Sequence, residues 1–354
     1  MSKYLSKRFD KLTPYIPGEQ PKISNLIKLN TNESPFPPSP KAIAEAEIEL
    51  SRLNLYSDPE CTVLLKKLSE ILGVKEEQVI ATNGSDEILN FAFMAYCDNN
   101  TGVVFPDITY GFYKVFAELY NLEYKEIPLK DDLSIDYRDY LNAGKTIFIA
   151  NPNAPTGIYL GLDKIEEILK SNPDNIVVID EAYVDFGNES AVKLINKYNN
   201  LLVTGTFSKS RSMAGARLGF GVASKEIIKD LQAIRYSTNP YNVNRMTLAA
   251  GYGVLCDEEY TKSNLKEVIY NRDYLSDELK KLGFKMTDST ANFIFTKHEK
   301  ISGELLYNKL RERNILVRYF NKEKISDYLR ITIGTKDEMD KLIKNIKEII
   351  REVL

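Results

Sequence analysis

The sequence predicts an α/β protein in which a large domain holds a mostly parallel sheet between helices and a smaller α+β domain completes the chain. Between about residues 78 and 222, short apolar runs alternate with segments of helical period, which is typical of a chain that winds a parallel sheet. After about residue 224 the pattern changes to long charged helices and a few strand-like runs. At 354 residues, the chain is long enough for two such units.

Six apolar runs in the first unit are continuous rather than alternating, as in strands that are buried on both faces. These runs are QVIA (78–81), GVVF (102–105), TIFIA (146–150), NIVVID (175–180), LLVT (201–204) and LGFGVA (218–223). Helical segments lie between them, for example at 88–96 and 165–169. We place the large domain at 30–254, with the proline-rich segment 32–40 as an extended arm or linker.

We expect the smaller domain to combine residues 1–29, as an N-terminal arm, with residues 255–354. Charged helical patterns at 224–236 and 243–282 lead into this second unit. The elements that follow are a strand at 291–296, a helix at 303–313, strands at 315–320 and 328–334, and a helix at 336–353. In the last helix, apolar residues recur every three or four positions, so one face is expected to pack on the sheet.

Composition excludes several classes of function. A formal net charge of −3 gives no general attraction to nucleic acid. The chain has no apolar N-terminal segment and no apolar run long enough to span a bilayer, so we expect a cytoplasmic protein without a signal peptide or a membrane contact. The three cysteines are scattered and form no CxxC pair, which predicts neither a metal site nor a disulfide framework.

The chain has a single histidine, His298, in the polar stretch FTKHEK. We expect this side chain on the surface. A histidine-based triad or a histidine-rich metal site would need more histidines, so a general base would have to be a lysine, a carboxylate or a tyrosine.

Chemically distinctive residues follow five of the predicted strands, and ligands of open parallel sheets bind beyond the carboxyl ends of strands. We therefore expect these residues to meet in one crevice. In chain order they are Gly84, Ser85 and Asp86, then Tyr110, then Asn151 and Asn153, then Asp180 and Tyr183, then Ser208 and Lys209.

Simpler interpretations exist for some of them. Ser85 or Asp86 could serve only as a helix N-cap, although the same helix start would offer N–H groups to a phosphate. The stretch NPNAPTG could be only a turn. Asp180 is harder to dismiss, because a carboxylate at the end of an apolar strand needs a cationic partner.

Lys209 lies in GTFSKSRSMAGARLG (205–219), which by itself could be a solvated basic loop. In a partly dry crevice, however, a lysine loses its proton readily, and the neutral amine is the usual nucleophile for a Schiff base. Pyridoxal phosphate requires three kinds of protein group: a lysine for its aldehyde, a carboxylate for its ring nitrogen and donors for its phosphate. Arg217 could reach that phosphate, whereas the role of Arg211 stays open.

Twelve blocks in the same order resemble the histidinol-phosphate aminotransferase family of the fold-type I pyridoxal-phosphate enzymes. The blocks are LTPYIPG, LNTNESP, LYSDP, NGSDEI, ITYGFY, NPNAPTG, IDEAYVDF, TFSKSRSMAGARLG, PYNVN, TANFIF, VRYF and LRITIGT. They span nearly the whole chain, which makes the resemblance specific.

The resemblance implies roles around the pyridine ring. Lys209 would form the internal aldimine and move the proton, and Asp180 would keep the ring nitrogen protonated. Tyr183 would hydrogen-bond to the ring hydroxyl, and Tyr110 would stack on the ring. Where the family often has an asparagine before Pro-Thr-Gly, this chain has Ala154, so either Asn153 turns inward to replace it or Tyr183 makes that contact alone.

The resemblance also implies how the anions are held. A homodimer with a shared active site is implied, because Tyr56 of the family pattern reaches in from the partner subunit. The residues implied for the cofactor phosphate are Ser85, Asp86, Ser208, Arg217 and Tyr56. Those implied for the substrates, histidinol phosphate and glutamate or 2-oxoglutarate in a ping-pong cycle, are Tyr15, Asn32, Arg318 and Arg330.

Three alternatives stay open at this point. The nearest is another enzyme of the same fold, such as an L-threonine-O-3-phosphate decarboxylase or an aromatic aminotransferase. A second is a regulator that senses pyridoxal phosphate, which would normally carry an added DNA-binding segment and a basic surface. The third is an α/β protein without a cofactor, in which Lys209 and Asp180 pair with each other.

Overall fold

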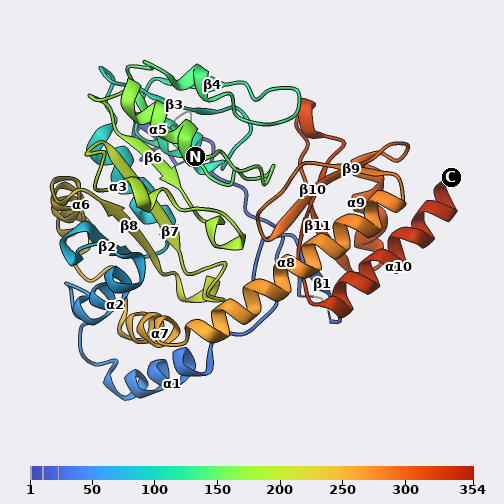
Figure 1. Cartoon of the computed structure of the whole chain (residues 1–354), viewed down its shortest axis with the longest axis horizontal. Helices are drawn as coiled ribbons and strands as arrows, with labels where there is room; N and C mark the ends of the chain where they lie inside the picture. The colour runs from blue at the N-terminus through green and yellow to red at the C-terminus, as the bar shows by residue number, and fades with distance from the viewer. Residues whose placement is uncertain (1, 10–11, 23) are drawn as a thin grey trace.

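A computed structural model describes residues 2–9, 12–22 and 24–354, so a small part of the predicted arm lies outside the described residues. Two sheets organise these residues, a seven-stranded one of order β2-β8-β7-β6-β5-β3-β4 and a five-stranded one of order β1-β11-β12-β10-β9. The helix α8 (Glu258–Lys281) runs from beside α7 (Arg245–Leu255) toward the second sheet (Figure 1). The predicted division at 30–254 stays a prediction.

The seven-stranded sheet contains all six predicted runs. Its strands are β2 (Val79–Thr82), β3 (Val103–Pro106), β4 (Tyr124–Ile127), β5 (Thr146–Ala150), β6 (Val177–Asp180), β7 (Leu201–Thr206) and β8 (Gly219–Ala223). Neighbours from β4 to β7 are parallel, whereas β8 runs antiparallel to both β7 and β2. The expectation that LGFGVA continues the parallel pattern is therefore wrong. The connection 207–218 contains no α-helix to carry the chain back, so the strand returns in the opposite direction.

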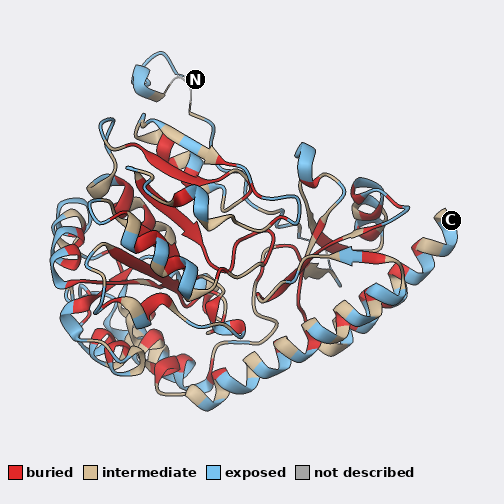
Figure 2. Cartoon of the chain, turned by 45° about the horizontal axis from the view of Figure 1, so that its top comes forward, coloured by how far each residue is buried: buried red, intermediate tan, exposed pale blue. Residues whose placement is uncertain are grey.

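The edge strand β4 was not predicted, because its sequence YKEI is not a continuous apolar run. Its residues Tyr124 to Ile127 are mostly half-buried or exposed. Helices cover both faces of the sheet, and its strands other than β4 are almost wholly buried (Figure 2). The helices of this region are α1 (Pro40–Glu49), α2 (Thr62–Leu72), α3 (Ser85–Tyr96), α4 (Phe112–Leu119), α5 (Leu162–Ser171), α6 (Lys225–Thr238) and α7.

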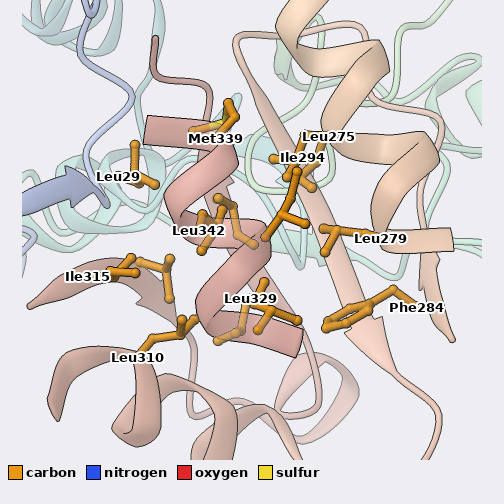
Figure 3. Packing of buried hydrophobic residues seen from close by; sticks show 14 of the residues in the cluster. Leu29, Leu275, Leu279, Phe284, Ile294, Leu310, Ile315, Leu329, Met339 and Leu342 are labelled. Atoms are coloured by element: carbon orange, nitrogen blue, oxygen red, sulfur yellow. The ribbon is translucent and has the colours of Figure 1, made fainter. Parts of the chain in front are cut away.

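The five-stranded sheet packs against α8, α9 (Gly303–Glu312) and α10 (Lys336–Val353). Its strands are β1 (Ile27–Leu29), β9 (Phe284–Met286), β10 (Phe293–His298), β11 (Ile315–Tyr319) and β12 (Leu329–Thr332). The predicted final helix is confirmed, and Thr335 caps it through a capping box with Glu338. Met339 and Leu342 of α10 face the apolar side chains of the sheet and of α8 (Figure 3).

Two predictions need correction in this region. The single helix expected at 243–282 is two helices that meet at Cys256 and Asp257, where the acidic pair Glu258 and Glu259 favours a new N-terminus. His298 is 8% exposed rather than on the surface. Its Nδ1 accepts hydrogen bonds from two backbone N–H groups, and its Nε2 donates to the carbonyl oxygen of Leu282 at 3.1 Å, so backbone groups compensate its burial.

Within the described residues, the three cysteines are free thiols and no group of three or more metal-binding side chains occurs. In the same part of the chain, no helix combines the length and the apolar character needed to cross a membrane.

Candidate active site

Two adjoining cavities lie beyond the carboxyl ends of β2, β5, β6 and β7. The first has a volume of about 270 Å³ and the second about 370 Å³. The residues that line both are Thr31, Tyr110, Ala154, Tyr183 and Lys209. Residues distant in sequence therefore meet at this edge of the sheet, as predicted from their positions just after the strands.

Lys209 lies just after β7, at the junction of the two cavities. Its Nζ donates a hydrogen bond to the carbonyl oxygen of Thr31 at 3.2 Å and lies 5.9 Å from the centre of the Tyr183 ring. Burial, together with the positive charges of Arg330 and Arg217, lowers the pKa of Lys209 to about 8. A substantial fraction of the amine is therefore neutral just above neutral pH, as a nucleophile for carbonyl carbon requires.

Asp180 ends β6 and is buried. Its Oδ2 accepts a hydrogen bond from the hydroxyl of Tyr113 at 3.0 Å, and its Oδ1 accepts one from Thr204 at 3.1 Å. Burial raises the pKa of Asp180 to about 6. Among the described residues Asp180 forms no ion pair, with Lys209 or any other cation. The alternative in which these two residues merely pair with each other is therefore wrong.

An anion cradle lies at the start of α3. Gly84 precedes the helix with φ 77°, and a Cβ there would lie 2.4 Å from Nη2 of Arg217. Arg217 donates to Oγ of Ser208 at 3.4 Å and to Oδ2 of Asp86 at 3.3 Å. The first turn of α3 carries Ser85 and Asp86, and neither side chain forms the N-cap hydrogen bond that was an alternative role for them. Free N–H groups and an arginine therefore face the first cavity.

Tyr110 closes one side of this cradle. Its hydroxyl donates to Oδ1 of Asp86 at 2.6 Å, and its ring meets that of Tyr113 edge-on at 5.8 Å. Burial, with the negative charge of Asp86, raises the pKa of Tyr110 well above its ordinary value, so the phenol stays protonated.

The second cavity brings together the residues predicted for substrates. Arg330 donates to the carbonyl oxygen of Asn30 at 3.1 Å, and its buried Nε has no hydrogen-bond partner among the described residues. Arg318 contacts the carbonyl oxygens of Ile16 and Pro17 on the N-terminal arm at 3.3 and 3.4 Å. A half-buried guanidinium whose buried Nε is a free donor is a site for an anion.

Tyr15 and Asn32 also line the second cavity. The ring of Tyr15 stacks on Phe112 at 4.4 Å, which holds the arm over α4. Asn32 donates from Nδ2 to the hydroxyl of Tyr183 at 2.9 Å, and Thr332 fixes the other side of its carboxamide. Asn32, which follows β1, therefore orients the hydroxyl of Tyr183, and Thr332 of β12 holds Asn32 in place.

Three residues lie elsewhere. Asn153 is buried, and its carboxamide bonds to Thr156 in its own loop and to Ile108 and Thr109 in the loop after β3. It does not line either cavity, whereas Ala154 lines both. Tyr56 is 78% exposed and stacks on Tyr241 outside both cavities. Arg211, whose role was open, forms an ion pair with Glu258 at 2.7 Å.

Sequence analysis missed Tyr113 and Thr204 as partners of Asp180. The block ITYGFY contains Tyr113 three residues after Tyr110, so a helix start there would bring both rings to one side. Thr204 is the last residue of the predicted run LLVT, beside Asp180 in the parallel register of β6 and β7.

Comparison with known families identifies the fold and the class of enzyme. The family model described as aminotransferase class I and II matches residues 24–346. The chain belongs to this family. This aminotransferase is 49% identical over 355 residues to a histidinol-phosphate aminotransferase of Brachyspira hyodysenteriae, covering 99% of this chain and all of the relative. It is 47% identical over 351 residues to one of Clostridium acetobutylicum, covering 99% of this chain and all of that relative.

Two solved structures show that the chain shares its fold with enzymes of known structure. The histidinol-phosphate aminotransferase of Sinorhizobium meliloti, in complex with pyridoxal 5'-phosphate, superposes on this aminotransferase with a TM-score of 0.90, at 22% identity and with both chains fully covered. An L-threonine-O-3-phosphate decarboxylase of Porphyromonas gingivalis superposes with a TM-score of 0.77 at 21% identity, covering 92% of this chain and all of the other. The predicted fold class and the predicted family resemblance are confirmed, and these two structural likenesses describe the fold alone.

Proposed function

We propose that this aminotransferase converts histidinol phosphate and 2-oxoglutarate into imidazole-acetol phosphate and glutamate, with pyridoxal phosphate as its cofactor. The observation that carries the proposal is the second cavity, which opens onto Lys209 and is lined by Arg318, Lys322 and Arg330, with no carboxylate among the described residues of its lining. Histidinol phosphate and glutamate each bring an anion and an amino group, so the same cavity suits both halves of a ping-pong cycle.

The residues around the first cavity fit the cofactor. Asp180 is a buried carboxylate with no cationic partner in the part of the chain that the structure describes, and a protonated pyridine nitrogen would supply that partner. Tyr183 and Tyr110 would contact the ring. The residues that would hold the phosphate are Gly84, Ser85, Asp86, Ser208 and Arg217. When bound, pyridoxal phosphate supplies a ring that accepts the electron pair released at the substrate Cα.

The chain's own residues would then manage protons and position. Lys209, with its lowered pKa, takes a proton at Nζ and returns it. Asp180, ionised at neutral pH, would pair with the protonated ring nitrogen. Arg330 anchors a substrate anion with its free Nε donor, and Tyr15, stacked on Phe112, lines the same cavity.

The contact to the ring hydroxyl falls to Tyr183 in this proposal. The carboxamide of Asn153 is bound to the loop after β3, and the side chain of Ala154 offers no hydrogen-bond donor, so neither supplies the amide that the family often has. Asn32 donates to the hydroxyl of Tyr183 and sets its direction.

We also propose a homodimer in which Tyr56 enters the partner subunit's site. Tyr56 lies in a largely exposed region rich in apolar side chains, a composition suited to a second copy. The exposed apolar residues there are Ile43, Ile48, Leu50, Leu53, Leu55 and Val63. A cytoplasmic location suits the three free thiols.

Mixed dimers test the shared site. Lys209→Ala and Tyr56→Ala chains, each inactive or weakly active alone, are co-expressed with different tags and purified as the mixed species. One site of that species has both native residues, so activity should exceed that of either variant. Mixed dimers no more active than the two variants would contradict a shared site.

The substrate test uses the purified, cofactor-loaded protein. Borohydride reduction should fix the absorbing group to Lys209, as peptide mapping would show. Histidinol phosphate, phenylalanine and threonine phosphate are then added separately, and conversion of the cofactor to its amine form is followed by absorbance. Conversion with histidinol phosphate alone supports the proposal. Release of carbon dioxide from threonine phosphate would instead identify a decarboxylase.

A further inference from the structure

We propose that Lys322 is a specificity-determining residue that, with Arg318, binds the phosphate of the phosphorylated substrate and takes no part in binding glutamate. The inference rests on the proposed function and adds to it a means by which one cavity binds two substrates with different anionic groups, a phosphate and a carboxylate.

The charge of the second cavity is the first observation. Among the residues that the structure describes, its lining contains Lys209, Arg318, Lys322 and Arg330 and no aspartate or glutamate, whereas the lining of the first cavity contains three carboxylates. Uncompensated positive charge in a concave site raises the local concentration of anions, and most strongly that of dianions.

The second observation is that Lys322 has no competing partner. It lies on the exposed loop after β11, where its backbone N–H donates to the carbonyl oxygen of Phe320 at 2.9 Å. No carboxylate lies within ion-pair distance of its amine in the part of the chain that the structure describes. Lys324, two residues further on, is by contrast bound to Asp107 at 2.8 Å. Of these two lysines, only Lys322 is free of an ion pair within the described residues and can meet a ligand.

The three cations other than Lys209 divide between two ends of the cavity. Arg330 is half-buried, and its charge lowers the pKa of Lys209, so it lies near the reacting amine. Arg318 is opposite Arg330 in the register of β11 and β12 and reaches toward the arm. Lys322 follows four residues later and is exposed, which places it at the outer end.

The two substrates differ in what they present to that outer end. A phosphate monoester carries nearly two negative charges and three acceptor oxygens at neutral pH, so one arginine does not saturate it. Glutamate presents only one of its two carboxylates there, and that group carries one charge and is satisfied by a single bidentate arginine. Lys322 therefore adds binding energy for histidinol phosphate and little for glutamate.

The experiment compares half-reactions of the cofactor-loaded protein by the change in cofactor absorbance. With Lys322→Ala, the apparent second-order rate constant for histidinol phosphate should fall roughly three- to tenfold, as suits a solvent-exposed charged contact. The constants for histidinol, which lacks the phosphate, and for glutamate should stay unchanged. Lys322→Arg should restore the reaction of histidinol phosphate.

Lys324→Ala is the matched control, because it removes the same charge from the same loop but not from the cavity, and it should behave like the parent protein. Equal losses with glutamate, or no loss at all, would overturn the role of Lys322. If the parent does not react with histidinol phosphate, the proposed function itself fails. Lys322 is then judged by calorimetric titration of inorganic phosphate into the loaded protein: weaker binding in Lys322→Ala supports the site, and unchanged binding refutes it.

Discussion

The hydroxyl of Tyr113 donates a hydrogen bond to Oδ2 of Asp180 at 3.0 Å, and both side chains are buried. Tyr113 lies in the first turn of α4, and Asp180 is the last residue of β6. Thr204 donates to the other carboxylate oxygen from β7. These two neutral donors compensate part of the free-energy cost of burying the carboxylate, which forms no ion pair within the described residues. They also orient the carboxylate toward the first cavity.

Tyr113→Phe should shift the acidic limb of the pH profile. Removing the donor raises the pKa of Asp180 further, and the ionised form is the one that pairs with a protonated ring nitrogen. The acidic limb of kcat/KM should therefore move up by about half a pH unit to one pH unit, the equivalent of one hydrogen bond. The pH dependence of the glutamate half-reaction measures the shift.

Tyr120→Phe is the control for this variant. Tyr120 ends the same helix, and its hydroxyl donates to Asn90 at 2.7 Å rather than to Asp180. It should leave the acidic limb in place. A shift of the same size in both variants would show that general loosening of α4, and not the bond to Asp180, is responsible.

Asp180 should make the cofactor-free protein less stable as pH rises. Its pKa is about 6 in the folded chain against an ordinary value of 3.8, so the fold favours the protonated form. The associated stability is present below about pH 4 and is lost as pH rises through about 6, an amount of about 3 kcal/mol. Asp180→Asn should remove this dependence and be more stable than the parent at pH 7.

Urea unfolding without pyridoxal phosphate at pH 4.5, 6 and 7.5 would check this prediction. The buried Glu181, whose pKa burial raises to about 8, titrates in an overlapping range, so only the difference between the parent and Asp180→Asn is informative. Two curves that stay parallel across this range would contradict the assignment of the effect to Asp180.

Local sequence signals were sufficient for much of the fold and the site. Buried parallel strands are continuous apolar runs, and the residues just after them must share one edge of the sheet. This is why Lys209, Asp180 and Tyr183 could be placed at one cavity before any contact was known. The apolar period of 336–353 predicted α10 for the same reason, since one face of a helix repeats every 3.6 residues.

Other features depend on contacts between distant segments. The partner of Lys209 is Thr31, 178 residues away, and that of Tyr183 is Asn32, 151 residues away. Nothing in the residues around Lys209 reveals these contacts. His298 was misplaced because its polar neighbours in sequence suggest solvent, whereas backbone groups satisfy its ring. The direction of β8 likewise depends on the connection 207–218, which contains no α-helix to carry the chain back to the other end of the sheet.

Gly84→Ala should weaken cofactor binding. A Cβ at this position would lie 2.4 Å from Nη2 of Arg217, and φ is 77°, so both the arginine and the backbone must shift. We expect the dissociation constant of pyridoxal phosphate to rise about tenfold or more, as for the loss of one charged contact. Fluorescence or absorbance titration of the cofactor-free protein measures it.

Gly73→Ala separates the effect of backbone strain from the effect of a contact with Arg217. Gly73 also has a positive φ, 67°, but a Cβ there meets nothing within 4 Å. It should cost about 1 kcal/mol of stability from backbone strain and leave cofactor affinity unchanged. Equal affinities in the Gly84→Ala variant and the parent would refute the role of this glycine in placing Arg217.

The rate of cofactor capture should rise with pH through about 8. Only the neutral amine of Lys209 attacks the aldehyde of pyridoxal phosphate, and burial and Arg330 lower the pKa of this amine. Arg330→Met removes one positive charge and should move the rise to higher pH. Arg211→Met, which removes an arginine that pairs with Glu258 instead, should leave it in place. Stopped-flow absorbance with the cofactor-free protein measures the rate, and coincident pH profiles for Arg330→Met and the parent would show that Arg330 does not control the amine.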